Sequence, residues 1–334
     1  MKKTAIIGAG AIAYCHARAL DKLGVEICGV FDVNQDSARK LAAACGTEVI
    51  EDLSDIVASL DMVHLCTPPS FRIDYARTAM EAGCHVFMEK PMAINPADGQ
   101  ILVDLARTHG VRLMVDFNHR FRAGFQELLK VVQSGEIGDI VNVFIHRMGM
   151  LGGNAGTQND TWRRKAGTVC GMSIESLSHD IDMIWQLLGP VASVKADVRG
   201  TFADAPTFDT HVNALLSMRN GAMSLIHANW SSYLKNSARG VSGTRGTVIL
   251  EGDDLFDFTR LRLRTADMPE ERVIPLNDRY DFATCPSYFN ANRYFLECIE
   301  QGVDGSASGS HALETLKVSH AILNAARTQT AIPL

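Results

Sequence analysis

The feature that most constrains the fold is a regular alternation of short apolar runs and helical patterns over residues 1–121. Strand-like runs cover 3–7, 25–32, 61–69, 84–91 and 111–121, and helical patterns between them include 34–45, 72–83 and 96–110. Strands that alternate with helices predict an α/β fold with a parallel, doubly wound Rossmann sheet. Ligands bind such sheets at the carboxyl ends of the strands.

The first strand ends in a glycine-rich turn, Gly8-x-Gly10-x-x-Ala13, that leads directly into a helix. The first glycine permits a tight turn, the second lets the backbone approach a pyrophosphate, and the third small residue allows close helix–strand packing. The helix start offers free N–H groups, at Ala11 and Ile12, and a positive dipole end to phosphates. The turn therefore predicts a dinucleotide site.

The second strand ends in Asp32, about 20 residues after the glycines, where a carboxylate binds the adenosine ribose hydroxyls. A carboxylate repels a phosphate on that ribose, and no arginine immediately follows Asp32. We therefore predict NAD as the cofactor, with NADP as the alternative. The competing interpretation is that Asp32 only caps the helix of residues 34–45.

Polar residues and a proline stand at the ends of the later strands. Thr67 and Pro68 end one strand, Glu89 and Lys90 the next, and Asn118 lies near the end of the last. A lone lysine in such a place is usually a solvated loop residue. Because all these positions fall at carboxyl ends of parallel strands, we predict that they face the cofactor.

The pattern changes after Arg120. A helix is predicted over 125–138, a strand over 139–150, a hairpin over 210–231 with an Asn220-Gly221 turn, short strands over 247–252, 261–265 and 271–276, and a helix over 308–329. We predict an NAD(P)-binding Rossmann domain over 1–121. An α+β domain with a large, mostly antiparallel sheet follows over 122–334. Helices cover one face of this sheet, so the other is expected to form a homodimer or homotetramer.

A helical pattern follows residue 171 and carries Glu175, His179 and Asp182 at spacings of four and three, which places them on one helix face. The plain interpretation is a helix with a polar face and a core histidine. A metal pair of Glu175 and His179 is another interpretation, but no third ligand is identifiable, so no metal is predicted.

The composition argues against several kinds of binding partner and location. The net charge is −6 with no basic cluster, which argues against nucleic acid or an anionic membrane. No run reaches the ~18 apolar residues of a membrane span. The N-terminal "MKKTAIIGAGAIA" resembles a short secretory signal, but two glycines interrupt its apolar run. The eight cysteines form no C-x-x-C pair, and we predict a reducing, cytoplasmic location.

Taken in order, these motifs resemble the Gfo/Idh/MocA family of glucose–fructose oxidoreductases, inositol dehydrogenases and rhizopine-catabolism proteins. The marks are Gly8-Ala-Gly10-Ala-Ile-Ala13, Thr67-Pro68, Glu89-Lys90-Pro91, Asn118-His-Arg120-Phe121, Gly135-Glu-Ile-Gly138, Trp162-Arg163, His179-Asp-Ile-Asp182 and Gly243-Thr-Arg-Gly246. The resemblance covers nearly the whole chain. It implies an NAD(P)-dependent dehydrogenase acting on a sugar, a cyclitol or a related polyol.

The resemblance also implies roles for residues. Lys90 would lie beside the nicotinamide and the reacting hydroxyl, His179 would accept the proton, and Glu175 would orient His179 or bind an adjacent hydroxyl. The substrate contacts it suggests are Arg120, Trp162, Arg163 and Asp182. The alternatives in other functional classes are a non-catalytic NAD(P)-binding sensor and an NAD-dependent glycosidase on the same scaffold.

Three departures from the family pattern stand out. Glu175 occupies a position that is often Asp, the glycine run before it is thin, and Arg72 stands where many relatives have His. The longer acid puts the substrate assignment in doubt, whereas the arginine is expected to be neutral.

Overall fold

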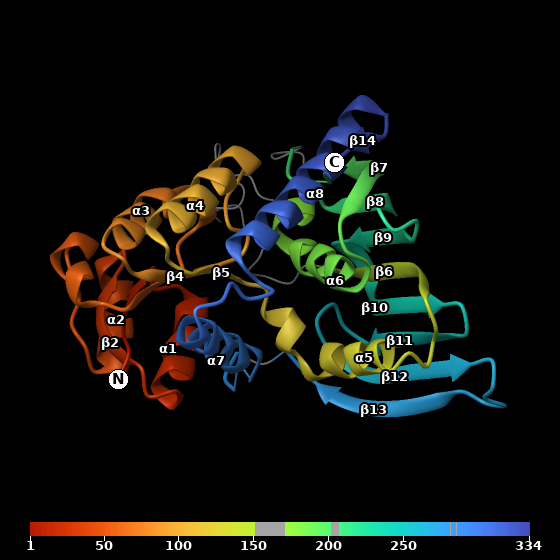
Figure 1. Ribbon diagram of the computed structural model, residues 1–334, viewed down its shortest axis with the longest axis horizontal. Helices are drawn as coiled ribbons and strands as arrows, with labels where there is room; N and C mark the ends of the chain where they lie inside the picture. The colour runs from red at the N-terminus through yellow and green to blue at the C-terminus, as the bar shows by residue number, and fades with distance from the viewer. Residues whose placement is uncertain (151–170, 202–206, 281, 285) are drawn as a thin grey trace. The chain divides into compact units, whose positions relative to one another are not determined.

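The computed structural model describes residues 1–150, 171–201, 207–280, 282–284 and 286–334. The chain divides into unit 1, residues 1–118 and 281–316, and unit 2, residues 119–280 and 317–334 (Figure 1). The chain first passes from unit 1 to unit 2 between residues 118 and 119, and the domain boundary after residue 121 stays a prediction. The assignment of 281–316 to the second domain differs, because helix α7 (Pro286–Gln301) packs against α1 (Ala11–Lys22) of the first unit.

Unit 1 contains the predicted parallel sheet, which confirms the Rossmann class. Its strands in the described part of the chain are β1 Lys3–Ile7, β2 Glu26–Phe31, β3 Met62–Leu65, β4 His85–Glu89 and β5 Leu113–Asp116, in the spatial order β2-β1-β3-β4-β5. The helices that follow β2, β3 and β4 are α2 Gln35–Cys45, α3 Arg72–Glu81 and α4 Pro96–His109. Figure 1 shows α3 and α4 on one face of this sheet and α1 and α7 on the other. Strands β3 and β5 are wholly buried, as expected for a sheet covered on both faces.

Unit 2 is built on one large, mostly antiparallel sheet, as predicted. Its strands in the described part of the chain are β6 Ile140–Met150, β7 Val191–Arg199, β8 His211–Met218, β9 Met223–Asn229, β10 Ser231–Gly243, β11 Gly246–Gly252, β12 Phe258–Thr265, β13 Arg272–Asp278 and β14 Ile332–Pro333. Their spatial order is β13-β12-β11-β10-β6-β9-β8-β7-β14, and β6 pairs with β9 in parallel. The Asn220-Gly221 turn joins β8 to β9, and Gly221 has the positive φ, 88°, that such turns require.

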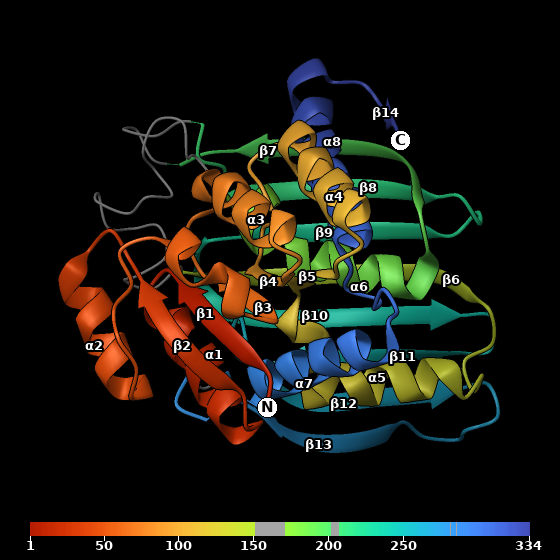
Figure 2. The same ribbon diagram turned by 60° about the vertical axis from the view of Figure 1, so that its left-hand side comes forward.

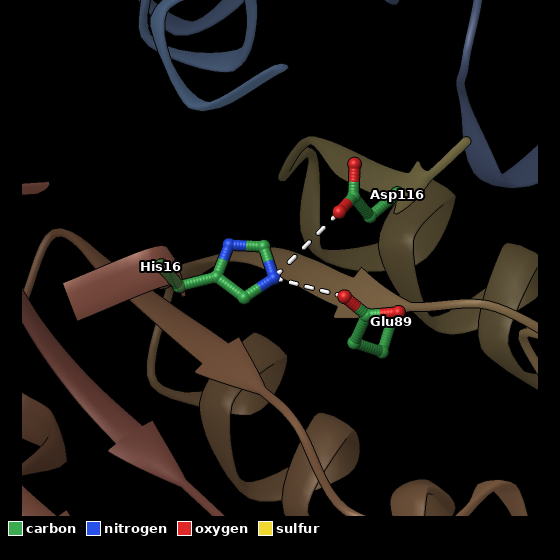
Figure 3. Close-up of side chains that lie close together, drawn as sticks. All are labelled: His16, Glu89 and Asp116. Carbon is green, nitrogen blue, oxygen red and sulfur yellow. Dashed lines mark hydrogen bonds and ion pairs between the residues drawn. The ribbon is translucent and has the colours of Figure 1, made fainter. Parts of the chain in front are cut away.

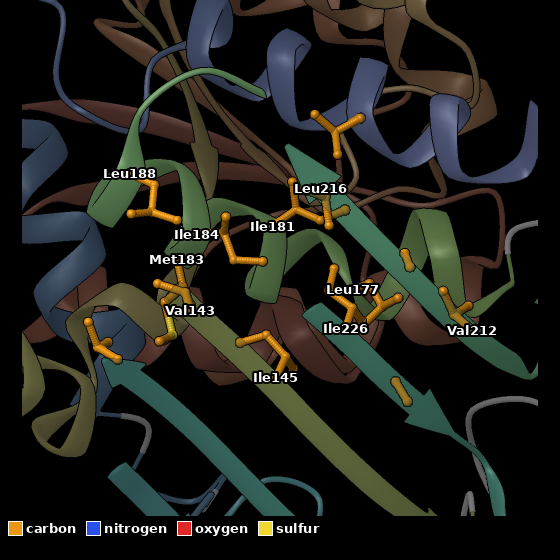
Figure 4. Packing of buried hydrophobic residues seen from close by; sticks show 14 of the residues in the cluster. Val143, Ile145, Leu177, Ile181, Met183, Ile184, Leu188, Val212, Leu216 and Ile226 are labelled. Atoms are coloured by element: carbon orange, nitrogen blue, oxygen red, sulfur yellow. The ribbon is translucent and has the colours of Figure 1, made fainter. Parts of the chain in front are cut away.

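Three helical segments cover one face of this sheet: α5 (Ala123–Gln133), α6 (Ser178–Leu188) and the second half of α8 (Gly309–Thr328), as Figure 2 shows. The core of unit 2 lies between them and the strands. In Figure 4 the aliphatic side chains of α6, including Ile181 and Ile184, interlock with Val143 and Ile145 of β6. The apolar spacing in α6 therefore fixes which of its faces meets the sheet.

Candidate functional site

The strand ends of unit 1 meet at one edge of the sheet. Ile7 of β1 pairs with Leu65 of β3, Leu65 pairs with Met88 of β4, and Glu89 of β4 pairs with Asp116 of β5. The predicted residues Gly8, Thr67, Lys90 and Asn118 follow these paired positions by one or two places. Because the strands are parallel, all of these residues lie along the same carboxyl edge.

The glycine turn has the geometry of a phosphate cradle. Gly8 has a φ of +99°, and an added Cβ would lie 2.7 Å from the backbone carbon of Cys66, so only glycine fits there. Gly10 is the N-cap of α1, and no side chain in the described part of the chain caps that helix. A Cβ at Gly10 would meet nothing within 4 Å. The N–H groups of Ala11 and Ile12 thus begin a helix beside open space, which fits a pyrophosphate.

Asp32 holds the glycine turn as well as the strand end. Its Oδ2 accepts a hydrogen bond from the Ala9 amide at 2.6 Å, and its Oδ1 accepts one from the Asn34 amide at 2.7 Å. The helix that follows, α2, is capped by Asn34, whose Oδ1 accepts from the amides of Asp36 and Ser37. The helix-capping interpretation of Asp32 is therefore wrong. Two lone-pair positions of the half-exposed carboxylate remain for ribose hydroxyls.

Hydrogen bonds to the backbone around Lys90 hold this residue in place. The guanidinium of Arg72, 2% exposed, donates hydrogen bonds to the carbonyl oxygens of Glu89 and Pro91, the two neighbours of Lys90. Its Nε and Nη2 donate to the Thr67 carbonyl at 2.9 and 2.6 Å. The Lys90 amide donates to Glu89 Oε2 at 3.2 Å, and the Lys90–Pro91 bond is cis. The arginine expected to be neutral is therefore the residue that joins two strand ends.

Behind Lys90 lies a buried polar cluster of His16, Glu89 and Asp116, drawn in Figure 3. His16 Nε2 is 3.0 Å from Glu89 Oε1 and 3.7 Å from Asp116 Oδ2. Burial disfavours the charged form of Glu89, but its hydrogen bond with His16 and the nearby charges of Lys90 and Arg72 outweigh burial. The pKa of Glu89 consequently lies below its ordinary value. One ligand atom from each cluster member falls within 4.8 Å of the others, so the cluster also has the spacing of a metal site.

Three other predicted cofactor residues have structural roles in unit 1. Asn118, 2% exposed, donates from Nδ2 to Ser287 Oγ at 3.4 Å, which ties the end of β5 to α7. Thr67 supplies the carbonyl that Arg72 binds, and Pro68 is the N-cap of the short 3-10 turn Pro69–Phe71 before α3. These contacts fix the backbone at the sheet edge where a cofactor would lie.

In unit 2 the predicted catalytic helix begins differently from the expectation. Residues Met172–Ser176 form a π-helical turn, and α6 begins only at Ser178. Glu175 belongs to the π turn, whereas His179 and Asp182 belong to α6, so a single α-helical face does not carry all three. All three side chains are buried. Asp209 anchors the turn: its Oδ2 accepts from the amide and the hydroxyl of Ser173, both at 2.7 Å.

Buried arginines hold α6 on both sides of His179. Asp180 is 3.0 Å from Arg147 Nη1 and 2.9 Å from Arg239 Nε, and all three side chains are at most 3% exposed. Asp182 accepts from Nε of Arg120 at 3.3 Å and also from its Nη2. The two predicted substrate residues Arg120 and Asp182 are thus paired with each other. These three ion pairs fix the rotation of α6 about its axis.

His119, which the sequence did not single out, stacks on His179. The ring centroids are 3.9 Å apart and the rings are tilted by only 8°. Burial, the neighbouring His179 and the positive charges of Arg122, Arg239 and Arg147 hold the pKa of His119 well below its ordinary value, so the ring is neutral near pH 7. A small cavity in unit 2 is lined by these rings together with Arg120, Asp182, Arg239 and Phe258.

Trp162 and Arg163, the remaining predicted substrate residues, lie outside the described residues. Four functional candidates were missed by sequence reasoning: Arg72, His16, His119 and Asp180. Only Asp180 had a local signal, because it directly follows His179 and is one of the two acids of α6. The other three depend on partners distant in the sequence.

Comparison with known proteins identifies both halves of the chain. Residues 2–117 match the oxidoreductase family with an NAD-binding Rossmann fold, GFO_IDH_MocA, and residues 125–249 match the GFO/IDH/MocA C-terminal domain. No helix among the described residues is both long enough and apolar enough to cross a membrane.

Three similar proteins have named activities or ligands. Glucose-6-phosphate 3-dehydrogenase of Bacillus subtilis is 31% identical over 56% of this chain and 54% of that enzyme. Inositol 2-dehydrogenase of Rhizobium meliloti is 27% identical over 95% of this chain and 94% of that enzyme. The structure of the WlbA dehydrogenase from Bordetella pertussis, in complex with NADH and UDP-GlcNAcA, is 26% identical with a TM-score of 0.84, covering 100% of this chain and 97% of that one.

Proposed function

The chain belongs to the Gfo/Idh/MocA oxidoreductase family, and from this we propose that it is an NAD-dependent dehydrogenase of a sugar, a cyclitol or a related polyol. The observation that carries the proposal is the set of hydrogen bonds that holds the backbone around Lys90 at the carboxyl end of β4. A glycine turn that fits a pyrophosphate lies along the same edge of the sheet. The similar proteins described above are dehydrogenases, which favours an enzyme over a sensor or a glycosidase.

Oxidation of a hydroxyl removes a hydride from carbon and a proton from oxygen. NAD, when bound, supplies the hydride acceptor. Lys90 stabilises the negative charge that develops on the substrate oxygen, because its ammonium donates a charged hydrogen bond in a site with little water. His179 accepts the proton and becomes an imidazolium. The His119 ring stacked on it is neutral, so it adds no repelling positive charge. Glu175 binds an adjacent substrate hydroxyl or orients His179.

The remaining predicted residues are proposed for binding. Gly8, Gly10, Ala11, Ile12, Asp32, Thr67, Pro68, Glu89 and Asn118 form the NAD-binding edge of unit 1. For the substrate we retain Trp162 and Arg163 as predictions. We propose that Arg120 and Asp182 contribute mainly by pairing with each other, because this ion pair fixes the helix that carries His179.

The test combines a substrate panel with two alanine variants. The wild-type protein is screened against sugars, sugar phosphates and cyclitols by NADH absorbance. Lys90→Ala should lower kcat by ~10²–10³-fold and His179→Ala by ~10²–10⁴-fold, with NAD affinity nearly unchanged. The exposed Lys40→Ala and His109→Ala variants are matched controls and should retain full activity. Turnover within about threefold of wild type in His179→Ala would assign the base to another residue.

The open face of the unit 2 sheet supports a proposed homodimer or homotetramer. Its outward side chains include Leu215, Met223 and Leu225, which are 43%, 50% and 49% exposed. Apolar residues gathered on an open sheet face favour association with a second copy. We also place the enzyme in the cytoplasm, a proposal that rests on the scatter of the eight cysteines along the sequence, with no C-x-x-C pair among them.

A further inference from the structure

A continuous chain of buried hydrogen bonds runs through unit 1 and ends behind Lys90. Thr4 Oγ1 lies 2.9 Å from His64 Nδ1, and His64 Nε2 lies 2.8 Å from Asn292 Oδ1. Asn292 Nδ2 lies 3.0 Å from His16 Nδ1, and His16 Nε2 lies 3.0 Å from Glu89 Oε1. All five side chains are buried, which shields their polar atoms from bulk water.

One backbone carbonyl sets the direction of the whole chain. Asn292 Nδ2 also donates to the Tyr288 carbonyl at 2.8 Å. A carbonyl oxygen only accepts, so the amide nitrogen, and not its oxygen, must face both Tyr288 and His16. His16 Nδ1 is therefore an acceptor without a proton, and the ring proton sits on Nε2, where it is donated to Glu89.

The same amide fixes the second histidine. Asn292 Oδ1 can only accept, so His64 Nε2 must carry the proton, and His64 Nδ1 accepts from the Thr4 hydroxyl. Burial lowers the pKa of His64 to about 3, which agrees with a neutral ring. Every donor in the chain thus points from Thr4 toward Glu89.

We propose that this directed chain makes His16 a positioning residue for Lys90. His16, held as the neutral ring with its proton on Nε2, keeps the Glu89 carboxylate ionised and turned so that Oε2 accepts the Lys90 amide. The inference rests on the proposed catalytic role of Lys90. It also assigns the His16–Glu89–Asp116 cluster to positioning and not to a metal, because the Nε2 lone pair that would bind an ion is occupied by a proton.

The protonation pattern is measurable without any turnover. In protein labelled with ¹⁵N-histidine, two-bond ¹H–¹⁵N correlation spectra distinguish the three forms of an imidazole ring. The His16 signal, assigned by its loss in His16→Gln, should show a bare Nδ1 and a protonated Nε2, as the hydrogen bonds of Asn292 require. In Asn292→Asp, which cannot donate to Nδ1, the same ring should become doubly protonated. An imidazolium or an Nδ1–H form in the wild type would overturn the inference.

Two substitutions at His16 test the positioning role. Gln places an amide nitrogen near the position of Nε2 and keeps the donor to Glu89, whereas Asn reaches only the position of Nδ1 and loses it. We expect His16→Gln to keep kcat within about fivefold of wild type and His16→Asn to lower it by ~10–100-fold, the cost of a misplaced catalytic group. NAD affinity should change by less than about threefold in both.

Three further outcomes are decisive. Equal loss of kcat in the two variants, or loss of NAD affinity in parallel with kcat, would assign His16 a merely structural role. Activation of the wild-type enzyme by added Zn²⁺, abolished in His16→Gln, would make the cluster a metal site and overturn the inference. Wild-type turnover in Lys90→Ala would defeat the proposed function and the positioning role, while the spectra would still decide the protonation of His16.

Discussion

Replacing Asp32 by Asn should change cofactor preference more than it changes stability. In the structure each carboxylate oxygen of Asp32 accepts one backbone hydrogen bond, from Ala9 and from Asn34. A carboxylate has about four acceptor positions, so about two remain for the ribose hydroxyls of NAD. A hydrogen bond to a charged group contributes about 1.5–3 kcal/mol, so the loss of the charge should weaken NAD binding by roughly 10–100-fold.

The same substitution removes a repulsion that acts only on NADP. A carboxylate and a phosphate charge about 4–6 Å apart repel by roughly 3–4 kcal/mol in a partly exposed site, and solvent reduces the effect. NADP binding should therefore improve by about tenfold or more, and the NAD-to-NADP affinity ratio should fall by roughly 10²–10³-fold.

Calorimetric titration of wild type and variant with both cofactors measures that ratio directly. Asp36→Asn is the matched control, because Asp36 is exposed in the first turn of α2 and its substitution changes the net charge equally. A separate thermal unfolding scan records the effect of the lost backbone contacts, which acts on both cofactors alike. A ratio that stays within about threefold of wild type, or tighter binding of NADP by the wild type, would refute the role of Asp32.

Three further outcomes are expected. Asp180→Asn should lower the free energy of unfolding by about 3–5 kcal/mol in denaturant titrations, because it leaves Arg147 and Arg239 buried without their counter-charge. The control Asp104→Asn, which removes the exposed partner of the exposed Arg107, should cost under about 1 kcal/mol. The pKa of His64 is about 3 in the folded protein and about 6.5 in the unfolded chain, so between these pH values only the unfolded chain binds the proton. As the pH falls from about 6.5 to about 3, the free energy of unfolding should therefore decrease by at most about 5 kcal/mol, and His64→Gln should abolish this decrease. In light scattering, the wild type should be a homodimer or homotetramer and Leu225→Arg a monomer, because Leu225 lies exposed on the open face of the sheet. A wild-type monomer at micromolar concentration would refute the proposed oligomer.

The parts of the fold that the sequence predicted well are those governed by neighbours in the chain. The Gly8 turn, the strand that ends in Asp32 and the Asn220-Gly221 hairpin depend on local backbone requirements, and the structure contains all three. The π-helical turn at Glu175 escaped prediction because helical periodicity does not distinguish one wider turn from α-helix.

What escaped prediction in the candidate site involves partners distant in the chain. Arg72 was expected to be neutral, yet it binds carbonyls at positions 67, 89 and 91. Likewise, the pattern of residues 286–301 contains no indication that this helix returns to unit 1, where its Asn292 binds both His16 and His64. Such contacts follow from the three-dimensional fold and have no counterpart in local spacing.

In each unit, buried charged groups hold the residue proposed to carry out the chemistry. In unit 1 Arg72 binds the carbonyls on both sides of Lys90, and in unit 2 the carboxylates of Asp180 and Asp182, which follow His179 closely, bind buried arginines. Buried ion pairs such as those of Asp180 and Asp182 add little net stability, because removing two charges from water costs about as much as their attraction returns. Apolar side chains would fill the same space at lower cost, but they would leave the backbone around Lys90 and the rotation of α6 less well defined. The charged groups are therefore best explained by the directional hold that they exert on Lys90 and His179, and a variant that weakens either hold should lose turnover even where its stability is restored elsewhere.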